Sequence, residues 1–438
     1  MRSSFSQSLL NTKKFKRQLL QWAQQFDDVI WLDSNEIDHP YAEYDAILAV
    51  DAFTSLKTDF SGAFDQLKEY KNTTQDWIFG YLTYDLKNDV ERLASKNHDG
   101  LGFADVHFFQ PKKLFLLKGN TIELHYLRMC DDEMELDLKE IAATNIPSLQ
   151  SIIEKKNNGT EPPVKIKLRI HKEAYYEKLE KLLAHIHRGD IYEANFCQEF
   201  YAEDAHINPI ETYLNLNDIS TPPFATFMKL DELYLLSASP ERYLKKNGNS
   251  VISQPIKGTA KRSENREEDI ELAKALKNDP KERSENVMIV DLVRNDLSKH
   301  ALKGSVQVEE LCEVYSFKQV HQMISTVTAK VADTRDALDV IEASFPMGSM
   351  TGAPKISAMN IIEELEETKR GIYSGAVGYF TPDDDFDFNV IIRSILYNSA
   401  TSYVSYSVGG AITAESIPEK EYEECLIKAK AMRQVLEG

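Results

Sequence analysis

The sequence predicts an α+β fold with mainly antiparallel β-sheets. Runs of adjacent strand-like segments are joined by links of hairpin length, and few strand–helix–strand alternations occur. Neither the G-x-G-x-x-G pattern nor the G-x-x-x-x-G-K-[ST] pattern is present, so the nucleotide-binding folds receive no support. The chain has 438 residues, 42% of them hydrophobic and 28% charged, which is typical of a globular protein.

The first 150 residues are expected to form short strands among helices. Apolar residues that recur at helical spacing predict an amphipathic helix over residues 15–26. Apolar and alternating segments predict strands at residues 29–32, 46–50, 77–81 and, around a turn at Gly119-Asn120, 113–126.

The remainder of the chain is expected to combine strand pairs with long helices. Helices are predicted over residues 172–188, 269–277, 279–297 and 419–436. Strands are predicted at residues 225–229, 233–238, 243–246, 251–253, 304–308, 325–331, 375–380, 388–397 and 403–408. Asp279 and Pro280 make a typical helix start, with Glu282 as the capping-box residue. Ser416 and Glu419 repeat that pattern before the last helix.

A polar stretch with glycine and two prolines at residues 154–163 divides the chain into regions 1–160 and 165–438. The formal charge of −19 argues against a nucleic-acid partner, because phosphate backbones require concentrated Lys and Arg. No apolar run approaches the roughly 20 residues of a membrane helix, so no membrane association is expected. Four widely separated cysteines indicate reduced thiols, as in a cytoplasmic protein.

Two segments carry candidate catalytic side chains. Glu241 follows a strand-like segment at a proline turn, and Lys257 lies between a proline-started turn and a glycine. A partly desolvated lysine can lose its proton near neutral pH and act as a nucleophile. Together the two residues would supply a nucleophile and a general acid. A surface carboxylate and a loop lysine are the alternative interpretations.

Two helical carboxylate pairs form a candidate metal site. Glu282 and Glu285 stand three residues apart, and so do Glu421 and Glu424, so the carboxylates of each pair share a helix face. Two such helices could close an oxygen-rich site for Mg²⁺. Helix capping and solvated surface carboxylates explain the same spacing without a metal.

Glycine-rich turns and one isolated arginine are candidate ligand-binding features. Residues 345–355 and 371–378 present backbone N–H groups that suit a carboxylate. Arg393 stands in the apolar run Val-Ile-Ile-Arg-Ser-Ile-Leu, where a charge requires a partner. A carboxylate ligand and a structural Asp or Glu are equally good candidates for that partner.

In combination, these segments resemble the chorismate-utilising enzyme family. The matching motifs follow in order from about Lys172 to the C-terminus: GDIYEAN (189–195), SPER (239–242), PIKGT (255–259), ENVMIVDLVRNDL (285–297), FPMGSMTGAPKISAMNIIEELE (345–366), RGIYSGAVGY (370–379), IIRS (391–394) and EYEE (421–424) with Lys428. The resemblance implies a sandwich-like core of antiparallel sheets with helices outside. It also implies that residues 165–438 are the chorismate-binding catalytic domain, and that residues 1–160 are similar to the N-terminal part of anthranilate synthase component I.

Lys257 indicates the branch of the family. In aminodeoxychorismate synthases the PIKGT segment carries a lysine nucleophile, whereas anthranilate synthases have a small residue there. Isochorismate and salicylate synthases use a lysine base where this chain has Glu193. The resemblance therefore implies a Mg²⁺-dependent, transaminase-class synthase that converts chorismate and ammonia to 4-amino-4-deoxychorismate, a precursor of 4-aminobenzoate and folate. Anthranilate synthase component I and a catalytically silent subunit of the same fold are the alternatives.

The resemblance also assigns roles to the candidate residues. Lys257 attacks ring carbon 2 of chorismate, and Glu241 protonates the hydroxyl that leaves carbon 4. Glu285 and Glu424 hold Mg²⁺, with the other two helical glutamates close by. The two substrate carboxylates are bound by Thr351, Gly352, Tyr373, Arg393, Gly409, Gly410 and Lys428.

Partners follow from the same resemblance. Ammonia is expected from a separate glutamine amidotransferase subunit, because no cysteine lies in a Gly-rich elbow of the amidotransferase type. Some relatives bind tryptophan, and the residues that would correspond are Ser34, Pro223 and Phe224.

Two positions depart from the family pattern. Gln322 stands where the family usually has a histidine, and His321 lies one place earlier. Either His321 takes over the role of the histidine that the family usually has, or the neutral amide of Gln322 is sufficient for that role. Glu193 stands where near relatives tend to have glutamine, and its charge beside a dianionic substrate is unfavourable unless it is paired or turned away.

Overall fold

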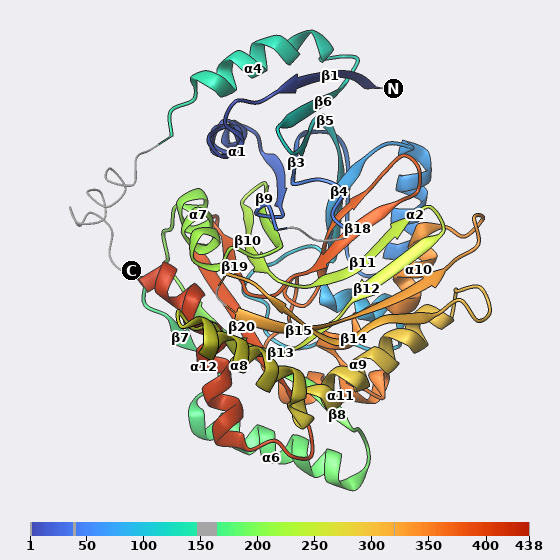
Figure 1. Ribbon diagram of the computed structural model, residues 1–438, viewed down its shortest axis with the longest axis vertical. Coiled ribbons are helices and arrows are strands. Elements are labelled where there is room, and N and C mark those ends of the chain that lie inside the picture. Colours follow the sequence, from blue (N-terminus) through green and yellow to red (C-terminus); the bar gives the residue numbers. More distant parts are fainter. Residues whose placement is uncertain (1, 38–40, 147–163, 319, 438) are drawn as a thin grey trace.

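The computed structural model describes residues 2–37, 41–146, 164–318 and 320–437 (Figure 1). The fold is α+β, as the sequence predicts, and every pairing between named strands of these residues is antiparallel. The linker expected at residues 154–163 lies outside the described residues. No helix of the described ranges is long and apolar enough to cross a membrane.

The chain before the linker forms strands and short helices, as expected. The strands are β1 (Arg2–Ser8), β2 (Asp28–Asp33), β3 (Ala46–Thr58), β4 (Ile78–Leu82), β5 (Val106–Lys118) and β6 (Thr121–Leu127). The helices are α1 (Thr12–Trp22), α2 (Ala63–Thr74), α3 (Lys87–Val90) and α4 (Met134–Ala143). The predicted amphipathic helix is α1, which ends at Trp22 and continues as a short 3-10 turn.

The chain after the linker contains most of the strands and the longest helices. The strands are β7 (Lys167–Leu168), β8 (Glu193–Ala202), β9 (Phe224–Leu230), β10 (Leu233–Ser239), β11 (Arg242–Asn247), β12 (Ser250–Gln254), β13 (Ile256–Lys261), β14 (Gln307–Ser316), β15 (Val320–Lys330), β16 (Gly352–Ala353), β17 (Ala376–Phe380), β18 (Phe386–Val390), β19 (Ser394–Asn398) and β20 (Tyr403–Ile412). The helices are α6 (Lys172–Arg188), α7 (Pro209–Ser220), α8 (Arg266–Asn278), α9 (Pro280–Ser298), α10 (Ala337–Ser344), α11 (Lys355–Leu365) and α12 (Pro418–Glu437).

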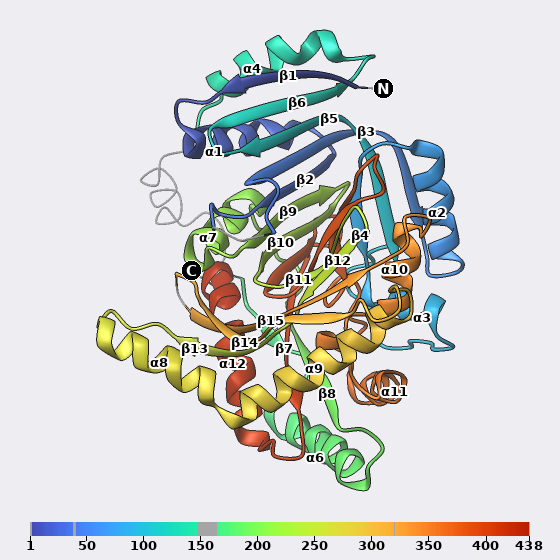
Figure 2. The same cartoon turned by 45° about the vertical axis from the view of Figure 1, so that its right-hand side comes forward.

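The strands form two arms that share β5. One arm runs β1–β6–β5–β3–β2–β9–β10–β19–β20–β8, and its first members lie in succession in Figure 2. The other arm runs β5–β4–β17–β18–β11–β12–β15, and β13 and β14 also pair with β15. Strands from before and after the linker therefore belong to one hydrogen-bonded sheet, since β2 pairs with β9 and β4 with β17.

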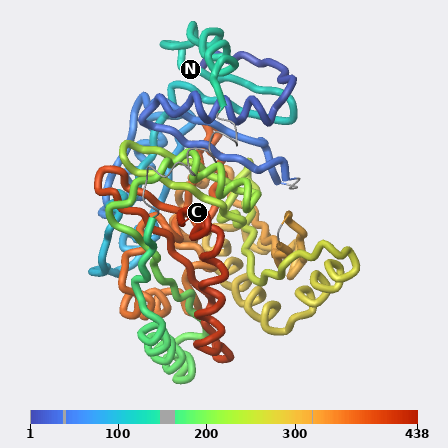
Figure 3. The backbone as a smooth tube through the Cα atoms, turned by 90° about the vertical axis from the view of Figure 1, so that its left-hand side faces the viewer, coloured from blue at the N-terminus to red at the C-terminus, as the bar shows by residue number. Residues whose placement is uncertain are grey.

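Helices cover the apolar faces of these arms. The C-terminal helix α12 packs along β20 and against α6 and α7 (Figure 3). On β8, Ala194 and Phe196 join the apolar core beneath these helices. Because strand side chains alternate between faces, Glu193, Asn195 and Cys197 share the opposite face of β8. That face lines the site described below.

Three local predictions are wrong. The strand predicted over residues 388–397 is divided into β18 and β19, and Arg393 at the break has a φ of 51°, which an ordinary strand does not permit. The strand predicted at residues 304–308 is instead β14, which begins later and is longer. Ser416 does not cap the last helix, because its hydroxyl accepts the N–H of Thr413 and α12 begins at Pro418.

Candidate active site

The two sheet arms meet at Lys257. β8 lies at the end of one arm, and β13, which carries Lys257, lies at the end of the other. Nζ of Lys257 donates a hydrogen bond to Oε1 of Glu193 across a distance of 3.1 Å. The two side chains are 10% and 1% exposed, so the pair that links the arms is shielded from bulk water.

Glu241 lies at the turn before β11 and is 3% exposed. Burial raises the pKa of its carboxyl to about 7, although hydrogen bonding to Ser349 and the charge of Lys257 act in the other direction. A carboxyl that retains its proton near neutral pH can serve as a general acid. Glu241 is therefore electrostatically coupled to Lys257 and chemically suited to the role of acid.

The protonation of Lys257 differs from the sequence-based expectation. Burial alone would lower the pKa of its amine, but the carboxylates of Glu193 and Glu285 outweigh burial and leave the pKa raised. The expectation that this lysine loses its proton near neutral pH is therefore wrong for the protein without substrate. Lys257 is held as an ammonium, and a nucleophilic role requires an acceptor for its proton.

The two helical glutamate pairs converge on Lys281. Nζ of Lys281 lies 3.7 Å from Glu285 of α9 and 3.5 Å from Glu421 of α12. Burial lowers the pKa of this lysine, but the charges of all four helical glutamates overcome it and raise the pKa. A Cβ atom added at Gly410 would lie 3.4 Å from Glu421 and 3.7 Å from Glu424, so β20 forms one wall of this acidic cluster.

The acidic cluster has the chemistry of a cation site. Burial raises the pKa of Glu285 to about 7, and Oε1 of this side chain has no hydrogen-bond partner among the described residues. Burial works against ionisation of Glu424, yet Lys428 at 2.7 Å holds the pKa of that carboxyl below its usual value. Within the described ranges no three His, Cys, Asp or Glu side chains are already arranged as a metal site. Lys281 lies between the two helices, where its positive charge offsets the negative charge of the glutamates.

Several residues expected to bind the substrate carboxylates gather beside β8. Lys428 donates to the carbonyl of Gly409 at 2.9 Å. A Cβ atom added at Gly409 would lie 2.4 Å from Sγ of Cys197, and the hydroxyl of Tyr373 lies 3.7 Å from the same sulfur. Gly409 and Tyr373 therefore lie together beside the buried Cys197 of β8, and Lys428 reaches the backbone of Gly409.

The backbone donors predicted at Thr351 and Gly352 are differently placed. The N–H of Thr351 donates to the carbonyl of Gly348 at 3.1 Å, so it is already used within the protein. Gly352 belongs to β16 and lies opposite Ala194 of β8, where an added Cβ would lie 2.1 Å from the carbonyl oxygen of Glu193. The glycine thus permits β16 to approach β8 closely.

Arg393 lies at the break between β18 and β19. Burial lowers the pKa of its guanidinium, and the charge of Glu241 opposes that effect. In the part of the chain that the structure describes, no carboxylate lies within ion-pair distance of Arg393, and the carboxylate whose charge acts on it is that of Glu241. Arg393 has a positive φ, which strains the backbone of a residue other than glycine. Residues strained in this way are concentrated at functional sites.

Comparison with known proteins identifies the family. The model of the family described as "chorismate binding enzyme" matches residues 10–434. The chain belongs to the chorismate binding enzyme family. Anthranilate synthase component 1 of Thermus thermophilus is 34% identical over 369 residues, covering 82% of this chain and 77% of the relative.

Two further relatives of this chorismate binding enzyme bear on its branch and fold. Aminodeoxychorismate synthase component 1 of Bacillus subtilis is 29% identical over 398 residues, covering 88% of this chain and 80% of the relative. The crystal structure of anthranilate synthase component I from Streptococcus pneumoniae has a TM-score of 0.75 at 27% identity, covering 91% of this chain and 93% of that one. The expected family fold is thereby confirmed.

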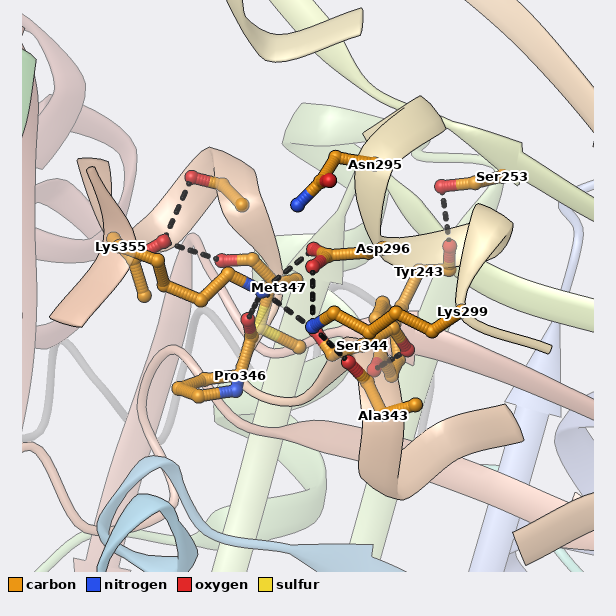
Figure 4. Close-up of polar contacts among 12 residues, drawn as sticks. Tyr243, Ser253, Asn295, Asp296, Lys299, Ala343, Ser344, Pro346, Met347 and Lys355 are labelled. Atoms are coloured by element: carbon orange, nitrogen blue, oxygen red, sulfur yellow. Dashed lines mark hydrogen bonds and ion pairs between the residues drawn. The ribbon is translucent and has the colours of Figure 1, made fainter. Parts of the chain in front are cut away.

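A polar network around Lys355 holds residues 345–355 of this chorismate binding enzyme (Figure 4). Nζ of Lys355 forms an ion pair with Asp296 of α9 at 2.6 Å and donates to the carbonyls of Ser344 and Pro346, each at 2.9 Å. Burial lowers the pKa of Lys355, while the charge of Asp296 opposes that shift. The network ties residues 345–355, which include the Ser349 partner of Glu241, to α9.

The structure distinguishes the roles of His321 and Gln322. Because His321 and Gln322 are neighbours on β15, they point to opposite faces. His321 lies 2.9 Å from Asp269 and 2.8 Å from Ser316, so it does not substitute for its neighbour. Gln322 is 1% exposed, and its Nε2 has no hydrogen-bond partner among the described residues.

The residues predicted to bind tryptophan line one cavity. Ser34, Pro223 and Phe224 all contribute to its wall. Its wall also contains Arg242, which pairs with Asp387 at 3.0 Å. Neither Lys257 nor Glu241 lines this cavity, although Arg242 directly follows Glu241 in the chain.

Sequence reasoning missed two side chains of the site. Lys281 precedes Glu285 by one helical turn, which was visible in the sequence, but its contact with Glu421 crosses 140 residues of chain. Ser349 belongs to a glycine-rich turn in the sequence, and its hydrogen bond to Glu241 joins residues 108 positions apart in the chain.

Proposed function

We propose that this protein is the synthase subunit that converts chorismate and ammonia to 4-amino-4-deoxychorismate. The observation that carries the proposal is Lys257, which lies in the PIKGT segment, is shielded from water and is coupled to the acid Glu241. The similarity to the aminodeoxychorismate synthase component of Bacillus subtilis supports this branch. The similarity to anthranilate synthases is as strong, so the proposal of this branch rests on the lysine.

In the proposed reaction, Lys257 attacks ring carbon 2 and the double bonds of the ring shift as the hydroxyl leaves carbon 4. Hydroxide is a poor leaving group, so Glu241 donates the proton that lets it depart as water. Ammonia then adds at carbon 4 and expels the lysine. Arg393, Tyr373 and Lys428 bind and orient the two substrate carboxylates, which holds the ring within reach of Lys257.

Mg²⁺ is the proposed cofactor. Glu285 and Glu424 would hold it, with Glu282 and Glu421 adjacent, and these carboxylate oxygens are the hard donors that Mg²⁺ prefers. Bound there, the ion would supply Lewis-acid polarisation of the ring carboxylate. Oε1 of Glu285 accepts no hydrogen bond from the described residues and has only the ammonium of Lys281 near it, at 3.7 Å, which supports this assignment.

A glutamine amidotransferase subunit is the proposed source of ammonia. The cysteines of this chain are buried and lie in the core, and burial raises the pKa of the Cys197 thiol to about 12. A thiol with so high a pKa is a poor nucleophile for releasing ammonia from glutamine.

The test is intact-protein mass spectrometry after mixing with chorismate and Mg²⁺ in the absence of ammonia. An adduct with the mass of chorismate less one water is expected on the wild type and not on Lys257→Ala. When ammonium is added, the product is expected to yield 4-aminobenzoate only with an added lyase. Fluorescent anthranilate formed without a lyase would assign the protein to the other branch, and no product would favour a silent subunit.

A further inference from the structure

Glu193 is a buried carboxylate that is only partly satisfied. It begins β8 and its side chain is 1% exposed. Oε1 accepts the hydrogen bond from Lys257, but Oε2 has no hydrogen-bond partner among the described residues. Burying a half-satisfied carboxylate costs free energy, and such groups are concentrated where they take part in chemistry.

Carboxylates from four elements act on the amine of Lys257. They are Glu193 of β8, Glu241 before β11, Glu285 of α9 and Glu424 of α12. Burial opposes them, but their combined charge leaves the pKa of Lys257 raised. An ammonium has no lone pair, so it cannot attack a carbon atom until a base removes one of its protons.

Geometry selects one of these carboxylates as the base. A general base must lie within about 2.6–3.2 Å of the atom that loses the proton. Among the described side chains, Glu193 is the carboxylate in hydrogen-bond contact with Nζ, at 3.1 Å. Glu241 must keep its own proton for the leaving hydroxyl, and Glu285 and Glu424 belong to the acidic cluster around Lys281.

We propose that Glu193 is the general base that deprotonates Lys257, an inference that rests on the proposed function because it requires a lysine nucleophile. In the first half-reaction a proton moves from Nζ to Oε1 of Glu193, and the freed electron pair on Nζ bonds to ring carbon 2. The double bonds shift, the carbon 4–oxygen bond breaks, and the hydroxide takes the proton of Glu241 and leaves as water.

The second half-reaction restores both residues. Ammonia bonds to carbon 4, the double bonds shift back, and Nζ leaves carbon 2 as a neutral amine. Lys257 then recovers its proton from Glu193. The carboxylate of Glu241 takes a proton from the new ammonium group on carbon 4, so that no proton or electron is gained or lost by the protein.

Glu193 also stabilises the ammonium form of Lys257, and this opposing effect makes the test decisive. If the carboxylate were only a counter-charge, replacing it by an amide would increase the fraction of free amine and speed the attack. If it is the base, its loss removes a contribution of about 100-fold to 10,000-fold. The two roles therefore predict changes of opposite sign.

The experiment measures single-turnover adduct formation by mass spectrometry with chorismate and Mg²⁺ but no ammonia. We expect Glu193→Gln to slow the reaction about 100-fold or more at pH 7, and the deficit to shrink about tenfold per pH unit as hydroxide replaces the base. Glu193→Asp keeps a carboxylate and is expected to be faster than Glu193→Gln. Glu199→Gln is the matched control, because Glu199 is buried on the same strand but pairs with Arg169.

Two outcomes would overturn the role of Glu193. One is a Glu193→Gln variant that forms the adduct as fast as the wild type or faster. The other is equal slowing in the Asp and Gln variants with the pH dependence of the wild type. In both, the wild type still forms its adduct, so the proposed function stands. If the wild type forms no adduct and Lys257→Ala retains full product formation, the proposed function itself fails.

Discussion

Replacing Glu241 by glutamine tests the proposed acid and the electrostatics of its site together. The carboxyl is 3% exposed, and burial raises its pKa from 4.5 to about 7. The folded protein therefore binds this proton more tightly than the unfolded chain, so the stability that protonation supplies is complete below pH 4.5 and is lost as the pH rises towards 7. At about 1.4 kcal/mol per pH unit, ionised Glu241 costs about 3 kcal/mol above pH 7.

Glu241→Gln removes the charge and keeps an oxygen that can accept a hydrogen bond from Ser349. We expect the free energy of unfolding in urea at pH 8 to exceed that of the wild type by about 3 kcal/mol, and by less than about 1 kcal/mol at pH 5. Adduct formation is expected to slow about 100-fold to 10,000-fold, because the leaving hydroxyl loses its acid. Glu180→Gln, on the exposed face of α6, serves as the control and should change neither quantity.

Either of two results would refute this reasoning. A gain in stability that is the same at pH 5 and pH 8 would mean that the buried charge is not its cause. Adduct formation at the wild-type rate in Glu241→Gln would mean that another group protonates the leaving hydroxyl.

Two further predictions concern the acidic cluster around Lys281 and the cavity lined by Ser34. Lys281→Met removes the ammonium that lies between Glu285 and Glu421, so Mg²⁺ is expected to bind up to about fivefold more tightly in calorimetry without chorismate, since a partly exposed ion pair contributes up to about 1 kcal/mol. Unchanged or weaker binding would show that Lys281 does not compete with the metal. Saturating L-tryptophan is expected to raise the melting temperature of the wild type but not of Ser34→Leu, whose larger side chain would fill the cavity. A wild type that does not respond would make the tryptophan prediction wrong.

Local patterns predicted most elements of the fold. The helix at Lys172–Arg188 has the predicted bounds, because its apolar face and its glycine C-cap are both encoded nearby in the chain. Asp279 caps α9 as predicted, since its carboxylate accepts the N–H of Glu282 at 3.0 Å. The break at Arg393 was not predictable, because the apolar run continues through it and its residues give no signal of the left-handed backbone.

The motifs identified Lys257, Glu241 and the helical glutamates, because residue type and spacing along one element are properties of the chain alone. The protonation states of these side chains could not be predicted from the sequence, because a pKa depends on burial and on the charges of residues in other elements. The lysine expected to be neutral is an ammonium, since the end of β8 brings Glu193 to it from a position 64 residues away. In the same way, the spacing places each glutamate pair on one helix face, but only the tertiary structure brings Glu285 of α9 and Glu421 of α12 to Lys281.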